Sequence, residues 1–179
     1  FAQLANFGVI FTVWKFFPFF KNQEKNHFGF LPLMLSIVLC GILVFTIVYV
    51  VFQNQIQQSY EENSPMFNSY YYWTLPIGIS YVLFLVLEAY LRSLYKNTVA
   101  IFAYEIGLRV LTTLLLVLVI PGWISFDSFV ILHSLLYLVP TIIILVYMYR
   151  LQELNLSFSS INISKRFKRI IFQFSSFYY

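Results

Sequence analysis

Residues 98–120 read TVAIFAYEIGLRVLTTLLLVLVI, and this stretch determines the class of the fold. About 20 residues at roughly 1.5 Å each cover the ~30 Å hydrocarbon core of a bilayer, so the stretch can cross a membrane as one helix. Its second half, 110–120, contains nine Leu, Val and Ile residues. Its first half carries Glu105 and Arg109, one helical turn apart on the same face. The sequence therefore predicts a transmembrane helix with an acid and a base inside the bilayer.

Arg109 is expected near the middle of that bilayer. If the helix begins after Asn97, Arg109 lies roughly 18 Å along it. A central Arg costs about 2.5–3.5 kcal/mol on insertion scales, whereas each following Leu, Val or Ile contributes roughly 0.3–0.6 kcal/mol in the opposite direction. Two interpretations stay open. Glu105 and Arg109 either neutralise each other and fix helix packing, or they belong to a substrate or ion path.

The whole chain has the composition of a polytopic membrane protein. Of its 179 residues, 60% are hydrophobic and 10% are charged, with a mean hydropathy of +0.79. Soluble domains average about 25% charged residues. We therefore expect an all-α bundle embedded in the lipid bilayer. Apolar runs predict five transmembrane segments, at residues 1–20, 28–52, 70–91, 98–120 and 128–149.

Residues 151–179 follow the last predicted span and are expected to form a linker. A basic run begins at Lys165 and is followed by an apolar run. This pattern predicts a basic interfacial helix that enters a further span. The chain begins inside an apolar run without Met and ends on aromatic residues. We therefore expect it to be a fragment of a longer chain.

The basic residues predict the orientation of the chain in the membrane. Ten of the eleven Lys and Arg residues lie in or beside residues 21–27, 92–97 and 150–179, whereas residues 53–68 and 121–127 contain none. By the positive-inside rule, the loops 21–27 and 92–97 and the tail 150–179 are cytoplasmic, and the loops 53–68 and 121–127 are external. The net charge of +4 therefore reflects membrane orientation, and no nucleic-acid partner is expected.

Three features of the apolar segments predict how the helices pack. Ala5, Gly8 and Thr12 are small residues at helical spacing, which let another helix approach closely. Gly41 lies in the middle of the second segment and is expected to mark a helix contact. Pro140 is expected to kink the last one.

Charged side chains in or near the spans are the candidates for function. The sequence has no His/Cys cluster with metal-ligand spacing and no Gly-rich phosphate loop, so we expect no enzyme activity, metal or cofactor. The candidate substrate-binding residues are Lys15, Glu88, Arg92, Glu105 and Arg109.

These five residues are expected to line a cationic cavity open to the cytoplasm, with Thr112 and Thr113 continuing the same side outward. Such a cavity suits an anionic head group such as a pyrophosphate. The alternative is local pairing. In that case Glu88 pairs with Arg92, Glu105 pairs with Arg109, and Lys15 extends its ammonium group to the interface.

Several strings in the sequence resemble one family of transporters. They are WKFFPFFK at 14–21, HFGF at 27–30, YYY at 70–72, LP at 75–76, EAY at 88–90 and EIGLR at 105–109. They are similar to helices two to six of the oligosaccharidyl-lipid flippases in the multidrug/oligosaccharidyl-lipid/polysaccharide exporter superfamily. The resemblance implies two lobes of six helices, with this chain in the first. The missing second lobe of the same chain is then its partner.

Flippases of this family move polyprenyl-pyrophosphate-linked oligosaccharides across the bacterial inner membrane by alternating access, for surface polysaccharide and lipopolysaccharide assembly. The resemblance implies that substrate and location here. Two alternatives stay open. A drug/cation antiporter of the same superfamily would favour buried carboxylates without an excess of buried cations. A membrane-embedded polysaccharide polymerase or ligase would need a large external loop.

Overall fold

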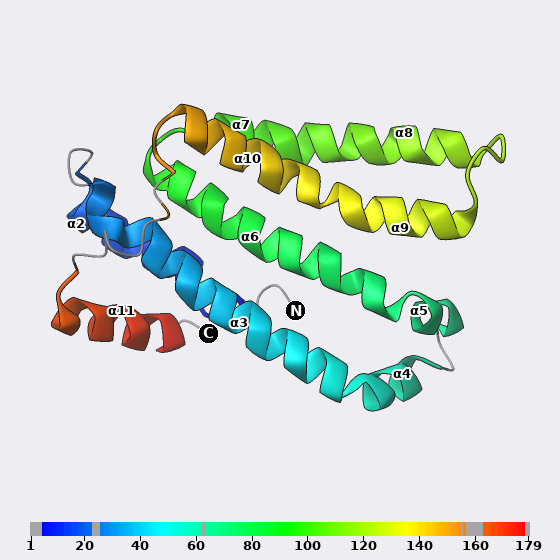
Figure 1. Ribbon diagram of the computed structural model, residues 1–179, viewed down its shortest axis with the longest axis horizontal. Coiled ribbons are helices and arrows are strands. Elements are labelled where there is room, and N and C mark those ends of the chain that lie inside the picture. Colours follow the sequence, from blue (N-terminus) through cyan, green and yellow to red (C-terminus); the bar gives the residue numbers. More distant parts are fainter. Residues whose placement is uncertain (1–4, 23–25, 62–63, 155, 157–162, 178–179) are drawn as a thin grey trace.

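The computed structural model describes residues 5–22, 26–61, 64–154, 156 and 163–177. These residues form helices and connections without a β-strand, which confirms the all-α prediction. Figure 1 shows the bundle, whose α-helices are α2 (Val9–Phe20), α3 (Phe30–Val51), α4 (Gln53–Glu61), α5 (Pro65–Ser69), α6 (Thr74–Ser93), α7 (Thr98–Ile101), α8 (Arg109–Val119), α9 (Phe126–Leu136), α10 (Leu138–Arg150) and α11 (Lys165–Phe177).

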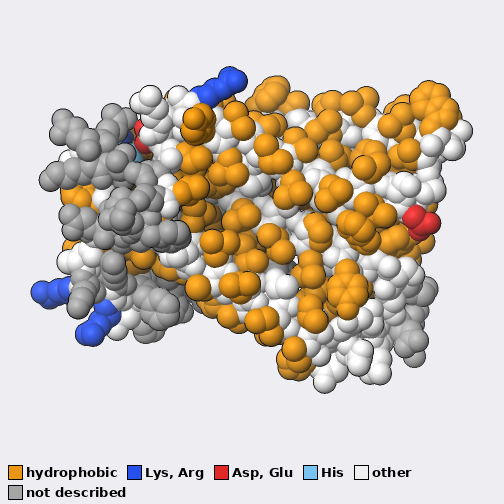
Figure 2. Space-filling view, viewed as in Figure 1, with side chains coloured by type: hydrophobic (Ala, Val, Ile, Leu, Met, Phe, Trp, Pro, Cys, Tyr) orange, Lys and Arg blue, Asp and Glu red, His pale blue; other side chains and the backbone are white. Residues whose placement is uncertain are grey.

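Three further helical segments join these elements. The 3₁₀ segments η1 (Asn26–Gly29) and η2 (Tyr71–Trp73) precede α3 and α6, and the π-helical segment η3 (Phe102–Leu108) joins α7 to α8. Four helical stretches in the described part of the chain are long and apolar enough to cross a membrane: His27–Val51, Tyr71–Ser93, Thr98–Val119 and Phe126–Arg150. On the face shown in Figure 2, hydrophobic side chains cover the long middle section. Length and composition therefore support a membrane protein.

The central helix of the bundle is α6. It packs against α2, α3 and α10, and in Figure 1 it lies between α3 and the α9–α10 pair. Leu87, Ala89, Tyr90 and Leu91 in its second half are almost completely buried. Because three helices cover this part of α6, its remaining side is the one that can border a site.

The first predicted span, 1–20, is described from residue 5, and its helix α2 covers Val9–Phe20. Phe7 and Gly8 both adopt left-handed backbone conformations, with φ of 45° and 65°, and α2 begins at Val9. Twelve residues rise about 18 Å, which is less than the ~30 Å of a bilayer core. In the described residues this helix is therefore too short to span a membrane by itself.

One segment differs from the sequence expectation, and another is divided near the proline that the sequence analysis singled out. The polar stretch 53–68, expected as a loop, forms the helices α4 and α5 in most of its described residues, because the Gln residues that dominate α4 are good helix formers. The last span is interrupted at Tyr137, between α9 and α10. Pro140 lies three residues later and lacks the amide proton that would bond to the carbonyl of residue 136.

Each end of the bundle is held together by side chains from different connections. At one end, His27 before α3 and Lys96 after α6 both contact Glu153 after α10. At the other end, the Tyr70 hydroxyl donates to the Asp127 carboxylate. The first contact set joins three segments that carry or adjoin the basic residues, and the second joins two segments without Lys or Arg.

Candidate functional site

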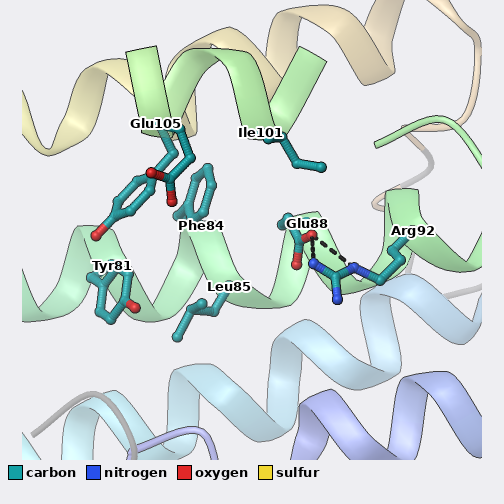
Figure 3. Close-up of a pocket in the computed structure, with 8 residues that line it drawn as sticks. Tyr81, Phe84, Leu85, Glu88, Arg92, Ile101 and Glu105 are labelled. Atoms are coloured by element: carbon teal, nitrogen blue, oxygen red, sulfur yellow. Dashed lines mark hydrogen bonds and ion pairs between the residues drawn. The ribbon is translucent and has the colours of Figure 1, made fainter. Parts of the chain in front are cut away.

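A pocket of about 350 Å³ opens between α6 and the segment formed by α7 and η3. Figure 3 shows side chains from both walls directed into the space between them. The lining residues are Tyr81, Phe84, Leu85, Glu88, Arg92, Ile101, Tyr104 and Glu105. This volume is at the small end of the range for ligand sites, which are concave, mostly apolar and aromatic, with a few polar groups.

The α6 wall places its pocket residues on one stripe of the helix. Tyr81, Leu85, Glu88 and Arg92 recur at steps of three or four residues, so the helical period puts them on one face. Arg92 donates from Nε and Nη2 to Glu88 Oε1 at 2.9 and 2.6 Å. The guanidinium carbon also lies 5.3 Å from the centre of the Trp14 ring on α2, within the range of a cation–π contact. Arg92 is therefore held by two neighbouring groups.

The opposite wall is built on the π-helical segment, which presents Tyr104 and Glu105. π-Helical turns are rare and often occur at functional sites. The Tyr104 ring stacks on Phe84 and Tyr81 of α6, with centroid separations of 4.7 and 5.6 Å. These rings join the two walls at one side of the pocket, and Glu88 and Arg92 lie away from them in Figure 3.

Glu105 and Arg109 form the ion pair that the sequence predicted as one of two alternatives. Arg109 Nη2 donates to Glu105 Oε2 at 2.6 Å, and the two side chains are 76% and 50% exposed in this chain. Exposed ion pairs contribute little to stability, about 0–1 kcal/mol in water. Packing among the described residues therefore does not explain why an acid and a base occupy these two positions.

The pocket brings together three of the five predicted residues. Glu88, Arg92 and Glu105 line it, and Arg109 reaches it only through Glu105. Lys15 is elsewhere: its ammonium nitrogen lies 4.0 Å from the centre of the Phe174 ring on α11. Lys15 therefore helps to dock α11 on α2 and does not line this pocket.

The charges around the pocket balance. The lining contains two carboxylates and one guanidinium. The Arg109 guanidinium, which is paired with Glu105, brings the sum to two negative and two positive charges. The expected cationic character is not a property of this lining. The Thr112 and Thr113 hydroxyls donate to the carbonyls of Leu108 and Arg109 in their own helix, and neither residue lines the pocket.

The sequence reading did not single out the pocket residues of the opposite wall. Ile101 lies four residues before Glu105 and three before Tyr104, which is the same helical spacing that marks the α6 stripe. That spacing was a usable signal. Within the described residues, no group of three or more His, Cys, Asp and Glu side chains is arranged to hold a metal ion.

Comparison with protein-family models, with curated proteins and with solved structures gave no match for this chain.

Proposed function

We propose that the chain is the part of a membrane transporter that helps to flip a lipid-linked oligosaccharide across the bacterial inner membrane. The observation that supports this most is the pocket between α6 and η3, which combines three aromatic rings with two carboxylates and a guanidinium. The strings similar to oligosaccharidyl-lipid flippases include residues of both walls, at 88–90 and 105–109.

The lining suits a sugar better than it suits a pyrophosphate. Carboxylate and guanidinium groups exchange hydrogen bonds with hydroxyls, and aromatic rings pack against the apolar face of a sugar ring. An anionic head group instead favours a net positive site. The polyprenyl-pyrophosphate-linked oligosaccharide would therefore place one sugar unit here and its pyrophosphate elsewhere in the complete transporter. No covalent bond changes in this reaction.

The proposed orientation follows from the charges. The end of the bundle that contains His27, Lys96 and Glu153 is cytoplasmic, because its segments carry or adjoin the basic residues. The end that contains Tyr70 and Asp127 is external. The pocket then lies nearer the cytoplasmic end, because Arg92, which lines it, is in the last turn of α6 and four residues before Lys96.

A drug/cation antiporter is the second candidate. The observation that favours it is the pair of carboxylates beside Tyr81, Phe84 and Tyr104, since aromatic rings and carboxylates both attract organic cations. Each carboxylate is paired with an Arg in this structure, which reduces that attraction.

Complementation tests the proposal. The complete gene would be expressed in a bacterial strain that lacks its own oligosaccharide flippase, and surface polysaccharide would be measured. Wild type should restore export, and Arg109→Ala and Glu88→Gln should abolish it at equal protein levels in the membrane. Thr113→Val is the matched control, because its hydroxyl bonds only within its own helix. Full export by both Arg109→Ala and Glu88→Gln would refute the role of the pocket as a substrate site. Drug resistance without export would favour the antiporter.

A further inference from the structure

The two walls of the pocket are joined by one short connection. α6 ends at Ser93 and α7 begins at Thr98, so residues 94–97 are the direct covalent link between the walls. Leu94 in this connection is buried, and Tyr95 adopts a left-handed conformation with φ of 61°. The path of this connection is therefore one constraint on how far the α7–η3 wall stands from α6, beside the packing of that wall on α10 and the stacking of Tyr104 on α6.

That connection is anchored from outside the pocket by Glu153. Lys96 Nζ lies 3.2 Å from Glu153 Oε1, and His27 Nε2 lies 3.0 Å from Glu153 Oε2. The side chains of His27 and Glu153 are 4% and 5% exposed, and that of Lys96 is 35% exposed. A single buried carboxylate thus links the start of α3, the α6–α7 connection and the end of α10.

Lys96 and Glu153 occupy equivalent positions, because α6 and α10 end in the same type of C-terminal cap. The Lys96 amide donates to the Leu91 carbonyl at 2.9 Å, and the Glu153 amide donates to the Met148 carbonyl at 3.1 Å. These are the six-to-one bonds of Schellman motifs. The residue before each, Tyr95 or Gln152, is left-handed although neither is Gly. α6 and α10 pack together and end at the same end of the bundle, so the equivalent residues after each cap meet.

The partners of the His27 ring determine its role. The Asn22 amide donates to Nδ1 at 3.0 Å, so Nδ1 carries a lone pair and Nε2 carries the proton that it donates to Glu153. The ring also lies 5.2 Å from that of Phe17 and 6.3 Å from that of Tyr90. His27 in this arrangement is a neutral donor that holds Glu153 in place, while Lys96 supplies the charge.

We infer that Glu153 is a positioning residue for the pocket. Held by His27, it fixes Lys96 and with it the connection that helps to set the separation of the two pocket walls. Neutralising Glu153 or removing the Lys96 ammonium frees this connection, and the α7–η3 wall then takes a range of positions against α6. This role rests on the proposed function only in treating the pocket as the substrate site.

The separation of the walls can be measured directly by electron paramagnetic resonance. Nitroxide labels would be placed at Leu85→Cys and Ile101→Cys, which line opposite walls, in the complete protein in lipid nanodiscs. Cys40→Ser removes the native thiol. The parent should give one narrow distance component. Glu153→Gln and Lys96→Met should replace it by a broad distribution, and Lys96→Arg should retain it.

Asp127→Asn is the matched control, because it removes the same charge at the opposite end of the bundle. It should leave the narrow component unchanged. Narrow components in both Glu153→Gln and Lys96→Met would overturn the inference. If Glu153→Gln does not fold, Lys96→Met decides alone, because its side chain is partly exposed. The distance measurement needs no transport, so its outcome is separate from that of complementation. If Glu153→Gln broadens the distance but the wild type does not restore export, the inference stands and the proposed function is refuted.

Discussion

The Cα of Gly41 lies directly against the carbonyl oxygen of Ala5. A Cβ added at Gly41 would stand 2.1 Å from that oxygen and 2.8 Å from the nearest atom of the Phe7 ring. The backbone before α2 therefore crosses α3 at a distance that only glycine permits. The sequence predicted a helix contact at Gly41 and a stripe of small residues that includes Ala5, and both residues are buried at this crossing.

Replacing Gly41 by Ala should destabilise the protein by about 1–3 kcal/mol, the usual range for an overpacked contact. The backbone oxygen cannot move away as the end of a flexible side chain would. Thermal unfolding in detergent, followed by circular dichroism, measures the change.

Gly107→Ala is the control for that substitution. It is also a glycine within a helical segment, but the nearest atom to its added Cβ is the Phe102 carbonyl oxygen at 3.8 Å, an ordinary contact. We expect its melting temperature to stay at or above that of the wild type. Equal melting temperatures for both variants would contradict the crossing at Gly41.

Gln152→Gly should stabilise the protein by about 1 kcal/mol. Gln152 has a φ of 57°, and the left-handed conformation costs a residue with a Cβ about 1–2 kcal/mol, part of which is offset by the greater freedom of Gly in the unfolded chain. Gln152 is exposed, so little packing is lost. Chemical denaturation measures the change, and Gln152→Val should move the stability in the opposite direction. A loss of stability in Gln152→Gly would show that the cap is not formed as described.

The Glu153 carboxylate should give the fold a pH-dependent stability. Burial by itself raises the pKa of this carboxyl, but the hydrogen bonds from His27 and Lys96 outweigh burial and hold the pKa below its ordinary value of 4.5. A carboxyl with a lowered pKa stabilises the folded state above its ordinary pKa, and this contribution is lost as the pH falls through the lowered value.

The comparison is made between the wild type and Glu153→Gln, because the lowered pKa depends on the His27 hydrogen bond. Glu153→Gln should reduce the free energy of unfolding by about 1–3 kcal/mol at neutral pH, as expected for the loss of a buried charged partner. The difference should stay constant down to pH 5 and close as the pH falls below 4.5. A difference that is the same at pH 7 and pH 3 would exclude Glu153 as its source.

The proposed orientation predicts which ends of the bundle are reachable from outside the cell. In a Cys40→Ser background, a single cysteine at Ser59 in α4 should react with a membrane-impermeant maleimide in intact cells. A single cysteine at Tyr95, an exposed residue at the other end, should react only after the cells are opened. Labelling of Tyr95→Cys in intact cells would reverse the orientation.

The sequence by itself determined the class of the fold and the local ion pairs. Long apolar runs cannot leave their backbone amides unbonded in lipid, so they form helices wherever they fold. Glu88 with Arg92 and Glu105 with Arg109 are four residues apart, so the helical period alone brings each pair together. The π-helical form of residues 102–108 and the late start of α2 carried no such periodic signal.

Only the tertiary structure decided which of these pairs meet and what holds them. Glu88 and Glu105 share a pocket because α7 turns back along α6, whereas Lys15 lies apart from it, against Phe174 of α11. Glu153 meets Lys96 across 57 residues and His27 across 126. Such contacts depend on helix packing and on two left-handed caps, and the periodicity of a single helix contains no information about either.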